Sequence, residues 1–187
     1  GLFTLEVNKW KKKKETLSLS STRSSIPLNA NLPRSLMFMI ETVSPEEATG
    51  LTAKIYGAFP PEIGIPDTMQ LQSASQPLMM LTAKMLEYWR RHETLSFELL
   101  AGIRYLTANV CAFDSCIDFN GKILAGMGIS QDELAAFRED PLRGPFEERE
   151  NALVAFVVRS LEADGPADPA ELDRLREFGW SDRDIYE

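Results

Sequence analysis

Residues 96–110 constrain the fold more than any other part of the sequence, because they form a helix-length stretch with almost no polar face. Ser96 is a good N-cap residue, and apolar side chains follow at helical spacing as far as Val110. Glu98 and Arg104 are the only charges, and their six-residue separation keeps them from pairing on one helix. A helix of this composition must be covered on several sides. We expect it to be the central buried helix.

Helix signals continue on both sides of this stretch. Ser44-Pro45-Glu46-Glu47 combines an N-cap residue, a proline at the first helical position and two first-turn acids, and Ser130 with Glu133 forms a capping box. No alternating strand pattern with hairpin chemistry is present, so we expect an all-α, multi-helix bundle. Besides 96–110, the expected helices run from 44 to before Pro60, over 67–75, from 77 through 89, from 114 to 126 or 128, from 130, and over 146–163 and 169–178.

The helix that begins at Pro77 carries apolar side chains at helical spacing, which predicts a core-facing stripe with methionines as core filling. These side chains are Leu78, Leu81, Met85, Tyr88 and Trp89. Residues 181–187 resemble the start of a helix that is cut short. A missing last helix would leave an apolar groove, and we therefore expect self-association into a homo-oligomer.

The charge of the chain is unevenly distributed. Of its formal net charge of −8, residues 1–36 carry +5, which leaves −13 for the remainder. Residues 1–36 are basic and then rich in Ser, Asn and Pro, so we expect an extended arm followed by a helical domain over 37–187. The acidic body argues against nucleic acid as a partner, and the lysine run 11–14 is typical of a solvated tail.

No apolar run approaches the roughly 20 residues that a bilayer span needs, and no secretory leader pattern is present. We therefore expect a soluble, cytoplasmic protein without a membrane partner.

Both cysteines lie in one short segment, at Cys111 and Cys116. On a continuous helix, positions five apart are rotated by roughly 140°, so the sulfurs would point to different faces. They could meet if one helix ends near Cys111 and the next begins with Asp114 or Ser115 as its N-cap. Cys116 would then lie in a first turn, where the helix dipole lowers the pKa, with Cys111 as a resolving partner. The alternative is that both are small buried apolar residues.

Several short motifs in this order resemble the alkylhydroperoxidase D / carboxymuconolactone decarboxylase family, over roughly residues 42–187. The motifs are Ser44-Pro-Glu-Glu-Ala-Thr-Gly50 before Ile55-Tyr56, Leu95-Ser96 ahead of the helix with Glu98, Asn109-x-Cys111, and Gly126-Met-Gly-Ile-Ser130.

In the redox branch of that family, a Glu lies about twelve residues before a C-x-x-C motif, and a His follows the second Cys by four. Here Glu98 lies thirteen residues before Cys111, Asp114 stands three after it, and Asn120 follows Cys116 by four. Asn is neither a general acid nor a general base near neutral pH. The resemblance thus implies a proton relay that is absent or rebuilt from Glu98, Asp118 or water.

The only histidine, His92, lies in a polar Arg90-Arg91-His92-Glu93 segment, and we expect it on the surface. Two cysteines and this histidine offer no familiar zinc spacing, and we expect neither a metal nor a cofactor.

Three functions are compatible with these features. The first is a thiol peroxidase in which Cys116 attacks a hydroperoxide, Cys111 condenses with the product, Glu98 assists proton transfer and an external dithiol resets the pair. The second is a decarboxylase-like enzyme that holds an anionic small molecule with Arg104. The alternative role for Arg104 is a structural salt bridge to Glu98 of a neighbouring subunit or to another acid. The third is a non-enzymatic helical oligomer that has lost the relay.

Overall fold

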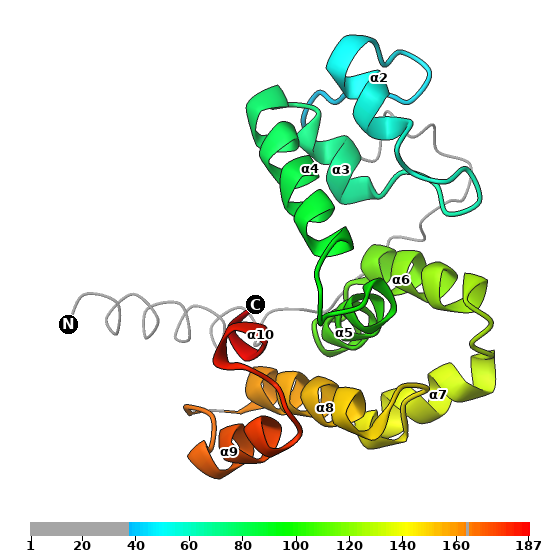
Figure 1. The fold of residues 1–187 in the computed structure, drawn as a ribbon. Coiled ribbons are helices and arrows are strands. Elements are labelled where there is room, and N and C mark those ends of the chain that lie inside the picture. The colour runs from blue at the N-terminus through cyan, green and yellow to red at the C-terminus, as the bar shows by residue number, and fades with distance from the viewer. Residues whose placement is uncertain (1–37, 164) are drawn as a thin grey trace, which may run out of the picture. The chain divides into compact units, whose positions relative to one another are not determined.

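The structure, a computed structural model, describes residues 38–163 and 165–187 (Figure 1). All regular structure in these residues is helical, which confirms the predicted all-α class for this part of the chain. The predicted arm, residues 1–36, lies outside the described residues. None of the described helices is long and apolar enough to span a bilayer. The elements are α2 (Gly50–Tyr56), α3 (Asp67–Gln72), α4 (Gln76–Arg90), α5 (Phe97–Val110), α6 (Asp114–Gly126), α7 (Gln131–Glu139), the 3-10 turn η2 (Pro141–Arg143), α8 (Glu148–Glu162), α9 (Pro169–Glu177) and α10 (Asp182–Tyr186).

Helix α5 occupies the central position that its composition predicts. The Ser96 side chain caps it, with its hydroxyl oxygen accepting a hydrogen bond from the Leu99 amide at 3.1 Å. The helix packs most extensively against α6 and then against α8. Half of its fourteen residues are buried, from Leu99 to Ala108, so α5 forms the centre of the main hydrophobic core.

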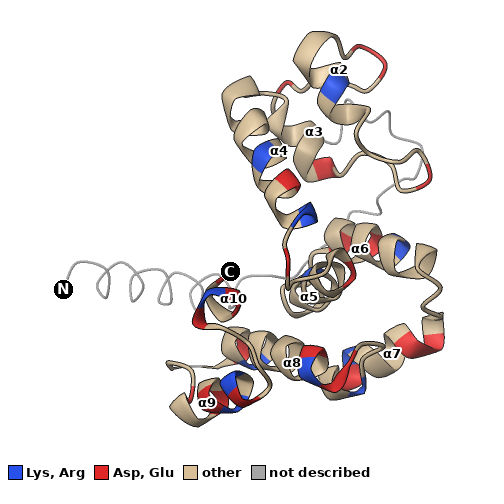
Figure 2. Ribbon diagram, viewed as in Figure 1, with Lys and Arg blue, Asp and Glu red and all other residues tan. Residues whose placement is uncertain are grey.

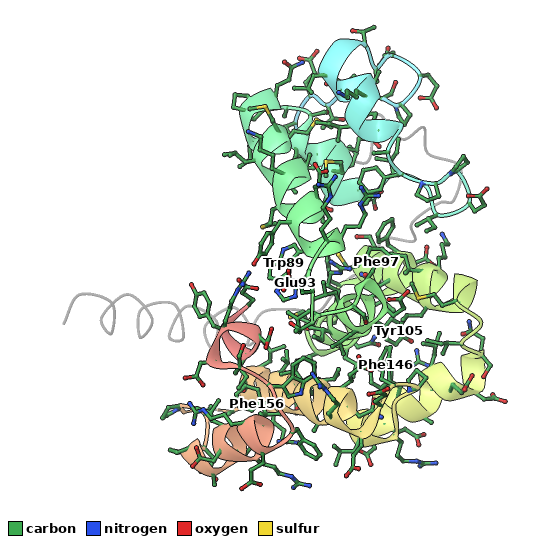
Figure 3. The ribbon with its side chains drawn as sticks, viewed as in Figure 1. Trp89, Glu93, Phe97, Tyr105, Phe146 and Phe156 are labelled. Atoms are coloured by element: carbon green, nitrogen blue, oxygen red, sulfur yellow. The ribbon has the colours of Figure 1, made fainter. Side chains whose placement is uncertain are left out.

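Gly102 lets α5 approach the segment before α8 closely. A Cβ at this position would lie 2.6 Å from Phe146 Cε2, which is closer than non-bonded carbon atoms approach one another. The Phe146 ring packs edge-on against Phe137 of α7, with 5.6 Å between the centroids. Figure 3 shows Phe146 and Tyr105 in the region between α5 and α8. The close approach therefore joins α5, α7 and α8 in one core.

A second, smaller cluster holds α2, α3 and α4 together. Its buried members are Ile55, Tyr56, Met69 and Met79, with Ala83 and Leu86 of α4 packed against them. The sequence predicts a different set of α4 side chains to be in the core, and for most of that set the prediction is wrong. Leu78, Leu81, Met85 and Tyr88 are exposed, and only Trp89 reaches the main core. Helix α4 is apolar on two faces, and α2 and α3 cover the face with Met79.

The first predicted helix begins later than expected. Ser44 caps only a single turn, in which the Glu47 amide donates to the Ser44 carbonyl oxygen at 3.2 Å. The helix starts at Gly50, whose φ of +55° lies in the left-handed region. An L-residue with a side chain rarely adopts this conformation, and a right-handed helix cannot continue through it. The glycine therefore separates the capped turn from α2.

The C-terminal helix α10 is tied to the connection between α4 and α5 by a polar cluster. Nε2 of His92 lies 2.5 Å from a Glu187 carboxylate oxygen, and the Tyr88 hydroxyl donates to the other oxygen at 2.6 Å. The Leu95 amide donates to His92 Nδ1 at 3.0 Å. The His92 side chain is only 4% exposed, so the prediction of a surface histidine is wrong. Its partner Glu187 is too distant in sequence for local patterns to indicate it.

We expect Gly102→Ala to destabilise the protein by about 1–3 kcal/mol, because the new methyl group overlaps the Phe146 ring, and the better helix propensity of Ala offsets only part of this. Urea unfolding measures the change. Gly126→Ala is the matched control, since its Cβ would meet open space at the end of α6. Equal free energies of unfolding for the two variants would contradict the close packing of α5.

The Glu187 cluster predicts a stability that depends on acidic pH. The Tyr88 hydroxyl, followed by His92 and Arg183, lowers the pKa of Glu187 from 4.5 to about 2. A depressed carboxyl pKa stabilises the folded state above pH 4.5, and this contribution is lost as the pH falls toward 2. The gap in urea midpoint between the native chain and Glu187→Gln should therefore shrink over that window. The exposed Glu177→Gln serves as control, and a gap that does not vary with pH would refute the assignment.

Candidate functional site

The two cysteines lie at a tight reversal between α5 and α6. Cys111 is the C-cap of α5, and Ala112 adopts a left-handed φ of +51°. The Phe113 amide donates back to the Ala108 carbonyl oxygen at 2.9 Å, and α6 begins at Asp114. The predicted helix break is therefore confirmed. The predicted N-cap is wrong: Phe113 takes that position without a side-chain hydrogen bond, because the left-handed turn at Ala112 already redirects the chain.

The reversal gives the two thiols different surroundings. Cys111 is exposed, whereas Cys116, in the first turn of α6, is half-buried. Both are free thiols. The interpretation of the pair as two buried packing residues is therefore wrong for Cys111.

Arg104 and Asn120 join Cys116 where α6 runs back along α5. Nε of Arg104 donates to Asn120 Oδ1 at 3.3 Å, and Asn120 Nδ2 donates to the Cys116 carbonyl oxygen at 2.8 Å. Asn120 is 3% exposed. Its buried amide therefore connects the Arg104 guanidinium with the backbone of the first turn of α6. The Arg104 guanidinium also lies over the Phe97 ring, 5.9 Å from its centroid. No carboxylate of residues 38–163 or 165–187 forms an ion pair with Arg104.

Burial and the two neighbouring charged groups shift the pKa of Cys116 in opposite directions. Burial raises the pKa of the Cys116 thiol, the carboxylate of Asp67 raises it further, and the Arg104 guanidinium lowers it. The net effect is a raised pKa with desolvation as its largest cause, which is opposite in direction to the lowering that the helix dipole predicts. Burial also lowers the pKa of Arg104, and a Cys116 thiolate acts in the opposite direction.

Two sequence-predicted residues lie apart from this group. Glu98 is exposed in the first turn of α5, whereas Cys111 caps the other end, which places them about 20 Å apart along the helix axis. Asp118 is exposed on α6 and forms an ion pair with Lys122 at 2.7 Å. Neither residue is brought to Cys116, Arg104 and Asn120.

Sequence reasoning missed Asp67 and Phe97. Asp67 begins α3, and no local motif connects it with a cysteine 49 positions later. Phe97 is exposed at the start of α5 (Figure 3), where a single aromatic residue gives no signal of contact with an arginine about two helical turns later. Among the residues that the structure describes, no group of three or more His, Cys, Asp or Glu side chains could hold a metal ion.

A scan against protein-family models, a search of curated proteins and a search of solved structures each return no match to this chain.

The arrangement predicts different reactivities for the two thiols. At neutral pH, iodoacetamide should alkylate the exposed Cys111 before Cys116, whose raised pKa keeps it largely protonated. Arg104→Gln should slow Cys116 alkylation further, because it removes the charge that favours the thiolate. Mass spectrometry of each cysteine peptide over a range of pH measures both effects. Arg138→Gln, at an exposed position of α7, is the control; an equal rate at Cys116 in both variants would contradict the electrostatic role of Arg104.

Proposed function

We propose that this chain reduces small hydroperoxides through Cys116, with Arg104 as the cation that stabilises the thiolate. The observation that carries the proposal is the grouping of Cys116, Arg104 and Asn120 between α5 and α6. The support is a half-buried thiol whose thiolate form is favoured electrostatically by a guanidinium that pairs with no carboxylate among the described residues. The motif resemblance to the alkylhydroperoxidase D family supports the same reaction class.

The proposed reaction has three balanced steps. The Cys116 thiolate attacks one oxygen of the hydroperoxide, the O–O bond breaks, and the leaving alkoxide takes up a proton to become an alcohol. Cys116 is oxidised by two electrons to a sulfenic acid. The Cys111 thiol then condenses with it, which forms a disulfide and releases water, and an external dithiol reduces that disulfide by exchange.

Arg104, Asn120 and Cys116 each have a different role in these steps. The Arg104 guanidinium favours the thiolate and, in this proposal, also stabilises the negative charge that develops on the leaving oxygen. Asn120 positions Arg104 through its amide oxygen and is not a proton carrier. Because the pKa of Cys116 is raised, the thiolate is the minor form at neutral pH. The rate of the first step should therefore rise with pH through and above 9.

The absence of an ion pair between Arg104 and any carboxylate of the described residues favours a second candidate, the binding of an anionic small molecule. A cation that is held partly away from water and meets no carboxylate among the described residues can accept a carboxylate ligand with two parallel hydrogen bonds. In this decarboxylase-like function Cys116 would be part of the wall of the site and would not react.

Free-thiol counting tests the peroxidase proposal. One equivalent of an alkyl hydroperoxide should remove two thiols per reduced chain, and faster at about pH 9 than at about pH 7. Cys116→Ser should abolish the loss. Cys111→Ser should instead stop at a sulfenic acid, which dimedone traps and mass spectrometry detects. Arg104→Gln should slow the first step, whereas the exposed Arg138→Gln should not.

Two outcomes would contradict the proposal: thiols that survive the hydroperoxide, or oxidation that proceeds equally in Cys116→Ser. If the thiols survive, the second candidate is examined with the same variants. Succinate should then raise the melting temperature of the native chain and not that of Arg104→Gln.

A further inference from the structure

Helix α4 carries a stripe of large apolar side chains that the described residues leave about half exposed. Leu78, Leu81, Met85 and Tyr88 are 53%, 60%, 51% and 43% exposed. Their spacing of three, four and three residues places them along one face of the helix. Figure 2 shows few charged residues along most of α4. We refer to these four residues as the α4 stripe.

The α4 stripe is not the outer edge of a core. Met79, Ala83 and Leu86 form the opposite apolar face, and they already pack against α2 and α3. A helix that is apolar on two faces is normally buried on both. We therefore expect a binding partner to cover the α4 stripe. The size and chemistry of the stripe limit what kind of partner this is.

The size of the α4 stripe matches the apolar centre of a protein interface. Four large side chains that are each about half exposed present roughly 300–400 Å² of mostly apolar surface, the size of the patches that are often functional. A stable dimer buries about 800 Å² per subunit, of which the centre is apolar and the rim polar. The stripe supplies about half of this area, so the expected association is weak and depends on concentration.

The pattern of the stripe fits a second copy of the same chain. A two-fold axis requires one patch that is complementary to itself. In an antiparallel pair of α4 helices, Leu78 would face Tyr88 of the other copy and Leu81 would face its Met85. Spacings of three and four residues are those that allow two helices to interdigitate over a narrow seam.

The charged residues beside the α4 stripe give no strong net charge that would attract an oppositely charged partner protein. Glu87 and Arg91 pair with each other at 2.7 Å, which leaves Lys84 as the one cation of that flank without a described partner. The Tyr88 ring is held in place, since its hydroxyl donates to Glu187 and accepts from Arg183 Nη2 at 2.7 Å. A fixed aromatic ring loses little conformational entropy on association.

We propose that two copies of this chain associate through α4, with the α4 stripes packed antiparallel against each other. The four residues of the α4 stripe do not include Cys116, Arg104 or Asn120, and the proposal does not rest on the proposed function.

Sedimentation velocity of the full chain, from low micromolar to several hundred micromolar, tests the proposal. The native chain should shift from monomer to dimer as the concentration rises. Leu81→Lys and Leu78→Lys should each weaken dimerisation at least tenfold, because a charge enters the seam. The control is Leu142→Lys, at an equally exposed leucine of η2 away from the stripe, and it should leave the equilibrium unchanged.

Melting curves verify that each variant is folded, which is expected because the replaced side chains are exposed. Cross-linking tests the orientation in a Cys111→Ser, Cys116→Ser background. A mixture of Leu81→Cys and Met85→Cys chains should form a mixed disulfide dimer faster than either chain alone. A native chain that stays monomeric at every concentration would overturn the proposal, as would dimers that are equally stable in Leu81→Lys and Leu142→Lys.

Discussion

The reversal between α5 and α6 is the constraint on which both the core and the thiol group depend. Helix α5 buries half of its residues, and it can do so only because α6 folds back along it after three residues. That turn requires the left-handed backbone of Ala112, a conformation that costs an alanine about 1 kcal/mol. The same turn leaves Cys111 in solvent and carries Cys116 inward toward Arg104 and Asn120.

Desolvation, more than any single hydrogen bond, sets the chemistry of the candidate site. It raises the pKa of Cys116 and lowers that of Arg104, so each group becomes harder to ionise by itself. The Arg104 guanidinium stays charged, and a Cys116 thiolate near it offsets part of both desolvation penalties. The ionisation of Cys116 therefore depends on its burial and on the charge of Arg104 on α5. Asn120 holds this neighbour in place through a hydrogen bond from the Arg104 guanidinium to its amide oxygen.

The sequence was sufficient for features that depend on local chemistry and insufficient for those that depend on distant partners. The all-α class, the Ser96 cap, the Ser130 capping box and the break after Val110 follow from residues within one or two turns. The burial of His92 depends on Glu187, and the raised pKa of Cys116 depends in part on Asp67. The sequence also could not show which of the two apolar faces of α4 is buried, because the apolar residues of both faces recur at helical spacing.

The polar cluster around His92 also has a consequence for the order in which the fold assembles. The partners across the α5–α6 reversal, such as Arg104 and Asn120, are 16 residues apart, whereas His92 and Glu187 are separated by 95. Closing the longer loop costs more chain entropy, so the hairpin of α5 and α6 should form early and the docking of α10 last. Docking of α10 is then the final step of folding, and α10 is the first element to detach when the native state opens locally.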